Sequence, residues 1–431
     1  MQFYLNNILI ELIFIFLHFL LFVINFKIAQ RKIMQPAVLF SLLWFAVLLL
    51  HFIFSFTLLD ELPPLSLSTY LIFFIGAVTF SLGSFIQTVY WQKNFEKKDK
   101  LGRIPKVFDD EISPILRYIF LTICVVALPF FLMASYKIFV ASNIENFFIG
   151  LRTQLVYGDE DIGSLKYLFP FALVVYAINL KSFLVDRNKS NKLLFLISLL
   201  TTIIYAVFNT GRLSFLFVLV IYIGMSFIYK KDLLLKKLVL PIIIFMAVFI
   251  SLGIVYGKGG NVDISAKENI ASATQSTAIY MVASLNALDW DLNHQFTVNY
   301  NGDNSLRFFL KLGEQLNLIS NVKVNNLLTP FVLVPYVTNV YTFYSPYIKD
   351  FGKFYSWFMI GLFGLIHTFL YNKAVATKSL KYSLYYSLML FPLIISFFAD
   401  QYLTITSLWF QMIFLIEGVI FINKFFVIKK W

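Results

Sequence analysis

The sequence is poor in cysteine, histidine and charged residues. Its single cysteine, Cys124, lies within an apolar run, so an intrachain disulfide and a cysteine-based metal site are both excluded. Three of its 4 histidines, His18, His51 and His367, also lie in apolar runs, where such side chains usually hydrogen-bond between helices. Charged residues make up only 13% of the chain, which is too little for the surface of a soluble protein of this size.

The rest of the chain is strongly apolar. Hydrophobic residues make up 59% of the 431 positions, and the mean hydropathy is +0.79. A soluble core cannot bury that much apolar surface, so lipid must be the solvent for most of the chain. The apolar runs are about 20 residues long, which is the length of a membrane-spanning helix rather than of a barrel strand. The composition therefore predicts an all-α polytopic membrane protein.

About eleven apolar runs are candidate membrane spans. They cover residues 3–25, 34–57, 67–91, 115–137, 165–184, 193–208, 213–229, 238–256, 354–372, 382–399 and 403–422. The first run carries Glu11 and lacks both a basic segment before it and a small-residue cleavage site. We therefore expect a retained span rather than a signal peptide.

The basic residues select an orientation for these spans. Most of the 35 Lys and Arg residues fall in alternate short segments, such as 92–114 and 230–237, and it is the cytoplasmic loops that are enriched in this way. This predicts an external N-terminus and an internal C-terminus. The net charge of +12 then reflects topology and anionic inner-leaflet lipid, and no nucleic-acid partner is needed to explain it.

Residues 1–431 are expected to form a single transmembrane domain with two long external loops. The cytoplasmic loops are too short to fold a catalytic domain, whereas residues 141–164 and the large external loop 257–353 are long enough to carry a site. Within 257–353, residues 304–319 separate apolar from charged positions, which predicts short amphipathic helices at the membrane interface. Any chemistry should therefore face outward.

The segment "NTGR" (209–212) places a permanent charge in a short break between two apolar runs. Residues 193–229 must cross the membrane twice, which leaves roughly 16 residues, or about 25 Å, for each span. The turn is thereby drawn down to the outer headgroups, where an arginine pointing inward would meet phosphate. The alternative is an interfacial anchor. Arg152 and Arg307 also lie in expected external loops, and this recurrence favours a binding function.

Three segments together resemble a known family. They are "TNVYTFYSPYIKDFGKFYSWFMIGL" (338–362) at the end of the long external loop, the "NTGR" turn, and the earlier loop "IENFFIGLRTQLVYGDEDIG" (144–163). This combination is similar to the Wzy-type polymerases that extend O-antigen and capsular polysaccharides. The resemblance implies a GT-C-like polymerase architecture in the bacterial cytoplasmic (inner) membrane, with an active site facing the periplasm or exterior.

The resemblance also implies a reaction and its partners. The enzyme would be a metal-independent glycosyltransferase without a cofactor, moving a growing glycan from undecaprenyl pyrophosphate to the next lipid-linked repeat unit. Its partners would be these lipid-linked glycans, membrane lipid and a chain-length regulator protein. External arginines of the family are thought to engage pyrophosphate and glycan. By position, these roles fall on Arg152, Arg212 and Arg307, with Lys258 as a weaker candidate.

The transfer also needs a base and a surface for the sugar. A carboxylate must take the proton of the acceptor hydroxyl, and Asp350 and Glu160 are the candidates, although Asp350 could instead cap a helix. Tyr341, Tyr344 and Tyr347 could hold sugar rings against their aromatic faces.

Other acidic segments leave alternatives open. "DWDLNH" (289–294) supplies Asp289, Asp291 and His294 as further base candidates, but two acids and one histidine are a weak metal signal without more ligands. Asp400 is either a turn residue or a partner for an arginine. As a whole protein, the chain could also be a polysaccharide ligase of the same architecture or a flippase of lipid-linked oligosaccharide. A flippase should carry charges at mid-membrane and internal symmetry, and neither is evident.

Overall fold

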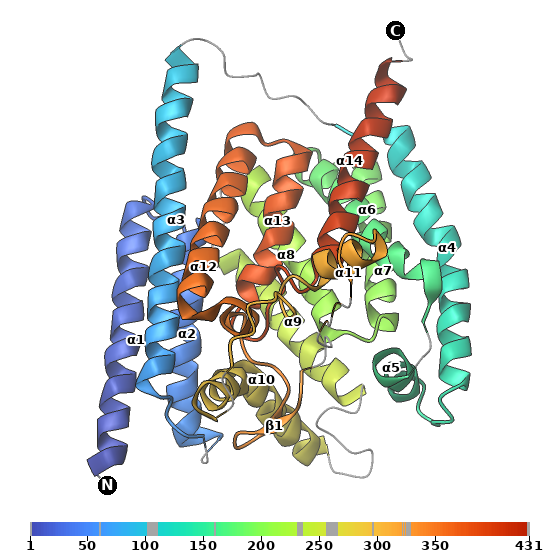
Figure 1. Ribbon diagram of the computed structural model, residues 1–431. Coiled ribbons are helices and arrows are strands. Elements are labelled where there is room, and N and C mark those ends of the chain that lie inside the picture. The colour runs from blue at the N-terminus through green and yellow to red at the C-terminus, as the bar shows by residue number, and fades with distance from the viewer. Residues whose placement is uncertain are drawn as a thin grey trace. The chain divides into compact units, whose positions relative to one another are not determined.

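The structure is a computed structural model that describes residues 2–59, 62–100, 111–158, 161–230, 236–255, 266–294, 297–320, 322, 324 and 329–428. Its described residues are mostly helical (Figure 1). The chain divides into two compact units. Unit 1 comprises Met1–Pro105, Gln275–Asn372 and Phe391–Thr406, and unit 2 comprises Lys106–Thr274, Lys373–Leu390 and Ser407–Trp431.

Unit 1 is assembled from the first and the later parts of the chain. Its helices are α1 (Gln2–Ile28), α2 (Pro36–Thr57), α3 (Leu67–Lys100), most of α10 (Ala266–His294), α11 (Arg307–Gln315) and most of α12 (Tyr344–Thr377). A two-residue hairpin, β1 (Val332–Leu333) paired with β2 (Val337–Thr338), lies between α11 and α12. The core forms where Trp44 of α2 packs against Phe73 of α3 and Tyr344 of α12, with ring centroids 4.7 and 5.2 Å from its own.

Glycines let α3 and α12 approach each other closely. A Cβ atom at Gly83 of α3 would clash with the carbonyl oxygen of Gly361, and one at Gly364 of α12 would clash with the carbonyl oxygen of Phe80. Small residues of this kind allow helix backbones to touch where lipid supplies no hydrophobic driving force between helices.

α12 consists of two limbs that meet at Gly352. The φ of this residue is 77°, in the left-handed region that glycine adopts without a steric cost. The first limb, residues 344–351, is the end of the long loop, and the second limb, residues 353–377, contains the span expected at 354–372. Gly352 itself is not helical, so the two limbs are separate helices joined at a kink.

Unit 2 holds the middle of the chain and its C-terminal helices. Its elements are α4 (Pro114–Val140), α5 (Phe147–Tyr157), the 3₁₀-helix η1 (Gly163–Tyr167), α6 (Leu168–Val185), α7 (Lys189–Phe208), α8 (Arg212–Tyr229), α9 (Lys236–Val255), the start of α10, most of α13 (Leu380–Ile394) and α14 (Thr406–Ile428). α6 is the central helix, since most of its residues are buried. Arg117 of α4 donates to Asn179 of α6 and Asn191 of α7, at 3.1 and 2.8 Å.

Among the described residues, nine helices are long and apolar enough to cross a membrane. They are Asn7–Ile28, Pro36–Thr57, Leu67–Asn94, Pro114–Val140, Gly163–Val185, Lys189–Phe208, Arg212–Tyr229, Tyr344–Thr377 and Thr406–Phe426. Each coincides with a span expected from the sequence. The helical content and these nine helices agree with an all-α polytopic membrane protein.

Elements at three further places differ from, or add to, the expected pattern. The span expected at 238–256 corresponds to α9, a helix of 20 residues. The span expected at 382–399 is too long, because α13 ends at Ile394. Residues 396 and 398 leave the helix and accept backbone hydrogen bonds from Phe343 and Thr342, at 2.9 and 3.1 Å. Within 257–353, α10 has 29 residues and is longer than the short helices expected there.

Candidate functional site

Arg212 is the first residue of α8, and only 7% of its surface is exposed. Its guanidinium carbon lies over the ring of Phe249 of α9, 5.2 Å from the centroid. It also lies beside Gly253 of α9, where a Cβ atom would come within 2.7 Å of it. The turn thus directs the guanidinium against the space that Gly253 leaves on α9. An interfacial anchor would instead extend its charge into solvent.

The position of Arg212 also has an electrostatic consequence. The N-terminus of a helix carries a partial positive charge, so a cation at this position adds to the positive potential instead of offsetting it. Gly211 supplies no side-chain cap to the first turn of α8. An anion at this turn would be attracted by both charges, and phosphate is the anion whose geometry matches a guanidinium fork.

Arg152 lies on α5, which packs beside the same turn. Phe147 and Phe148 of α5 contact Phe208, the last residue of α7, with ring centroids 5.7 and 5.9 Å apart. Asn146 caps α5 by accepting a hydrogen bond from the third helical N–H. Among the described residues, Arg152 forms no hydrogen bond or ion pair. Unit 2 therefore brings two of the three predicted arginines onto neighbouring elements.

Arg307 belongs to unit 1 and begins α11. Its Nε is enclosed by protein and has no hydrogen-bond partner among the described residues, and burial lowers the pKa of its guanidinium. No described carboxylate forms an ion pair with it. A partly desolvated cation without a partner is costly unless a ligand supplies the counter-charge. The other charged residues of α11, Lys311 and Glu314, lie along the same short helix.

Asp350 is fully buried at the end of the first limb of α12. Its Oδ1 accepts hydrogen bonds from the backbone N–H and the side-chain amide of Asn304, at 3.1 and 2.6 Å. Its Oδ2 accepts from the backbone N–H and the hydroxyl of Ser305, at 2.7 and 2.6 Å. The carboxylate is therefore a cap, as the sequence allowed, but it caps the turn that precedes α11 rather than its own helix.

The three predicted tyrosines are buried in unit 1. The hydroxyl of Tyr341 donates to the carbonyl oxygen of Pro330 at 2.9 Å, and that of Tyr344 donates to the carbonyl oxygen of Phe73 at 3.2 Å. Tyr347 is fully enclosed and donates to Asp400. In this structure their rings pack against protein, so the proposed contact with sugar stays a prediction.

Asp400 is a turn residue. Its carboxylate accepts hydrogen bonds from the hydroxyl of Tyr347 and from the backbone N–H groups of Tyr402 and Thr404, at 2.7, 3.1 and 2.9 Å. Burial raises the pKa of Asp400. The backbone hydrogen bonds confirm the turn interpretation, and among the described residues no arginine forms an ion pair with this carboxylate.

The segment 289–294 ends α10 and divides into separate interactions. Asp289 accepts from the backbone N–H and hydroxyl of Ser66 and from the hydroxyl of Thr69, so it caps the start of α3. Asp291 pairs with Lys349 at 2.9 Å, and the ammonium of Lys349 also lies 5.0 Å from the ring centroid of Tyr341. Among the described residues no group of three or more acidic, histidine or cysteine side chains could hold a metal ion.

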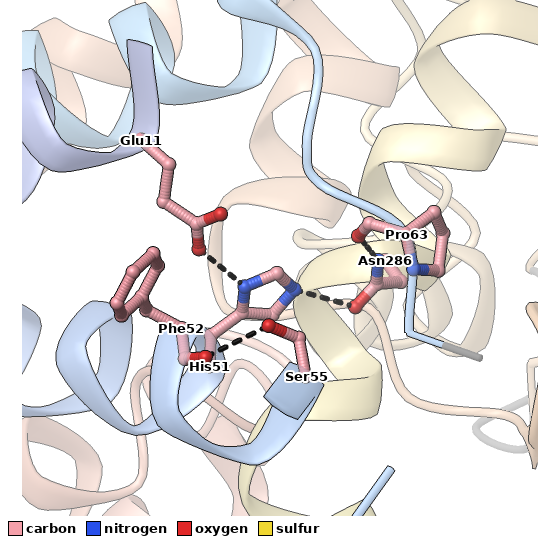
Figure 2. Close-up of polar contacts among 6 residues, drawn as sticks. All are labelled: Glu11, His51, Phe52, Ser55, Pro63 and Asn286. Atoms are coloured by element: carbon pink, nitrogen blue, oxygen red, sulfur yellow. Dashed lines mark hydrogen bonds and ion pairs between the residues drawn. The ribbon is translucent and has the colours of Figure 1, made fainter. Parts of the chain in front are cut away.

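A buried polar network joins three helices of unit 1, and the sequence did not predict it (Figure 2). His51 of α2 meets Glu11 of α1 through Nδ1, at 2.8 Å, and Asn286 of α10 through Nε2, at 3.0 Å. Asn286 donates its amide N–H to the carbonyl oxygen of Pro63 at 2.9 Å. The interpretation of His51 as a contact between helices is confirmed. Of its two partners, Glu11 stands out in the sequence as an acid within an apolar run, whereas no local pattern marks Asn286 as a neighbour of His51.

The orientation of Asn286 determines where the protons of this network lie. A carbonyl oxygen only accepts, so the amide nitrogen faces Pro63 and the amide oxygen faces His51. Nε2 of His51 must therefore carry a hydrogen. One further proton satisfies the contact between Nδ1 and Glu11, either as imidazolium with carboxylate or as neutral imidazole with carboxylic acid. Both forms leave the pair without net charge.

Two of the predicted site residues, Glu160 and Lys258, lie outside the described residues. No protein-family model matches the chain, and neither a curated protein nor a solved structure matches it. The chemistry of the residues themselves therefore has to indicate the function.

Proposed function

We propose that this protein is a polymerase of undecaprenyl-pyrophosphate-linked oligosaccharide repeat units, working at the external face of the bacterial cytoplasmic membrane. The observation that carries the proposal is the state of its arginines. Arg212 is buried at the positive end of a helix, and Arg152 and Arg307 form no ion pair with a described carboxylate. Cations held in this way favour a polyanionic ligand, and a lipid diphosphate is one that reaches this depth.

In the proposed reaction an acceptor hydroxyl attacks the anomeric carbon of the growing glycan. The new glycosidic bond forms as the bond from that carbon to the diphosphate oxygen breaks, and the diphosphate departs on its lipid. Arg212 and Arg152 stabilise the charge that accumulates on the leaving oxygen, helped by the start of α8. Arg307 would bind diphosphate or glycan on the part of the loop that belongs to unit 1.

The proton of the acceptor hydroxyl must pass to a carboxylate. Both oxygens of Asp350 already accept two hydrogen bonds each, so the proposal gives this role to Glu160 of the 141–164 loop. The transfer needs neither a metal nor a cofactor in this scheme. The orientation is the one chosen by the basic loops, with the N-terminus outside and the C-terminus inside.

The decisive experiment deletes the gene and examines the surface glycan by gel electrophoresis. A single repeat unit on the acceptor in place of a ladder is the result expected of a polymerase. Untransferred polymer would instead identify a ligase, and lipid-linked repeat units trapped at the cytoplasmic face would identify a flippase.

Complementation then tests the arginines. Arg212→Ala should restore no ladder at normal protein level, whereas Arg212→Lys should restore a shortened one, because lysine keeps the charge and loses the bidentate fork. Arg187→Ala, which removes an exposed arginine from a loop expected to be cytoplasmic, serves as the control and should restore the full ladder. A full ladder with Arg212→Ala would refute the assignment.

A further inference from the structure

All four hydrogen bonds received by Asp350 come from one turn of the long external loop. Asn304 and Ser305 each contribute their backbone N–H and their side chain, and one residue binds each carboxylate oxygen. Donor and acceptor are 45 and 46 residues apart in sequence. Asp350 therefore closes a long segment of the loop onto the first limb of α12.

This arrangement leaves the carboxylate little capacity for a substrate proton. An ionised carboxylate offers about four lone-pair sites, and the turn occupies that number. Its side chain is fully buried, so an acceptor hydroxyl would have to displace these donors to reach it. The geometry is that of a structural anchor rather than of a general base.

The anchored turn leads directly into Arg307. Gly302 has a φ of 76°, and its carbonyl oxygen accepts the N–H of Leu306 at 2.9 Å, which closes the turn. The side chain of Leu306 packs over Gly302, where a Cβ atom would meet it at 3.0 Å. α11 begins at the next residue, Arg307, whose Nε is enclosed and has no hydrogen-bond partner in the described part of the chain. Asp350 is thus the group that fixes the backbone from which this guanidinium projects.

We propose that Asp350 is a positioning residue that acts through Arg307. It holds the turn at residues 302–306 so that the guanidinium meets the diphosphate of the lipid-linked substrate, and it transfers no proton itself. This inference rests on the proposed function for the identity of the ligand. The hold of Asp350 on the turn can be tested without any assay of polymerisation.

The test compares a variant that removes the carboxylate of Asp350 with a variant that removes only the side chains that donate to it. In Asp350→Asn an amide nitrogen replaces the oxygen that faces Ser305, and this nitrogen cannot accept the hydrogen bonds of Ser305. The double variant Asn304→Ala with Ser305→Ala weakens the same anchor but leaves the carboxylate in place. Asp289→Asn is the control, because Asp289 is a carboxylate of the same unit that caps the start of another helix, α3, through three hydrogen bonds to one oxygen.

The first readout is the accessibility of Arg307 in the full-length protein in nanodiscs. Phenylglyoxal modifies accessible arginines, and mass spectrometry of the peptide gives its rate. Both anchor variants should accelerate modification of Arg307 several-fold, while Asp289→Asn should leave the rate unchanged. Equal rates in wild type and both anchor variants would overturn the proposal, whether or not the protein proves to be a polymerase.

The second readout is steady-state kinetics with a lipid-linked repeat unit. Both anchor variants should raise KM several-fold, leave kcat within about twofold and preserve the pH profile. In an Arg307→Ala background, Asp350→Asn should have no further effect on KM. A general base would behave differently: Asp350→Asn would abolish kcat and the acidic limb of the profile, while the double variant would retain kcat. Absence of polymer from the wild-type protein would refute the proposed function and leave the modification rates to decide the role of Asp350.

Discussion

Two buried histidines of unit 1 differ in what their ring nitrogens face. Nδ1 of His51 contacts the carboxyl group of Glu11 on α1, and Nε2 contacts the amide oxygen of Asn286 on α10. In His367, Nε2 contacts the hydroxyl of Tyr402 at 2.9 Å, and Nδ1 has no partner among the described residues. His51 therefore joins three helices by hydrogen bonds, whereas the described hydrogen bond of His367 goes to a loop.

The single proton between Glu11 and His51 predicts that the fold tolerates the loss of the carboxyl group at position 11. Glu11→Gln should unfold within about 1 kcal/mol of wild type, because the amide can donate to Nδ1 while Nε2 still donates to Asn286. His51→Ala should cost about 3 kcal/mol or more, since it strands a buried carboxyl group and a buried amide oxygen. Thermal unfolding in detergent measures both.

His367→Ala is the matched control for this prediction, because it opens a similar cavity and leaves only one hydroxyl without its partner. It should be less destabilising than His51→Ala. If Glu11→Gln proved as costly as His51→Ala, the pair would not share a single proton.

At this scale the sequence predicts residues better than it predicts their partners. Arg212 begins α8 just after the turn, as the pattern predicts, while the depth of this turn in the membrane stays a prediction. The donors of Asp350 could not be predicted, because they lie more than 40 residues away and are joined only by tertiary folding. Local patterns carry no information about such closures.

At the scale of elements, glycines leave space for two different kinds of neighbour, a side chain or a helix backbone. Gly253 of α9 leaves room for the end of a flexible side chain, that of Arg212. Gly364 of α12 leaves room for the backbone of α3 at Phe80. A side chain can move aside, whereas a helix backbone cannot without separating the two helices.

Gly253→Ala should therefore leave the protein folded and reduce function. The new methyl group would displace the guanidinium of Arg212, so the glycan ladder should shorten while the unfolding temperature stays within about 2 °C of wild type, a shift of less than roughly 1 kcal/mol. A full ladder would show that Arg212 does not need its place beside α9.

Gly364→Ala should have the opposite pattern. Its methyl group would clash with a backbone oxygen, and we expect a loss of about 1–3 kcal/mol in unfolding experiments. Gly361→Ala, three residues earlier on the same helix, is the control, because its Cβ would stay 3.4 Å from the nearest atom. Similar stability of the two variants would contradict the close contact between α3 and α12.

Some helix ends cannot be predicted from the local sequence pattern. The apolar pattern predicts a span over residues 382–399, yet α13 stops at Ile394 because the following carbonyl groups bond with Thr342 and Phe343. The break at Gly352 likewise turns the end of the long loop into a helical limb. The end of α13 depends on contacts with a distant part of the chain, which a hydropathy pattern does not contain.

At the scale of the whole molecule, charge and hydropathy make a definite prediction of topology. Asn143 and Asn301 are exposed residues of segments expected outside, and Lys189 is an exposed residue of a segment expected inside. In intact cells a membrane-impermeant maleimide should label Asn143→Cys and Asn301→Cys but not Lys189→Cys. The native Cys124 is buried and should contribute little background. Labelling of Lys189→Cys alone would reverse the orientation and end the proposal of an external active site.

The amino-acid sequence by itself determined the solvent of this protein and the chemistry available to it. Composition requires lipid and the apolar runs require helices, and the charge at the turn between two short runs predicts an arginine near phosphate, because these depend on short-range physical properties of the chain. Only the tertiary structure decided which of the polar side chains are bound by other residues of the protein. It enclosed Arg212 beside Gly253, bound Asp350 to Asn304 and Ser305, and joined Glu11 to His51, because most buried polar groups need partners and only the folded chain brings these residues together.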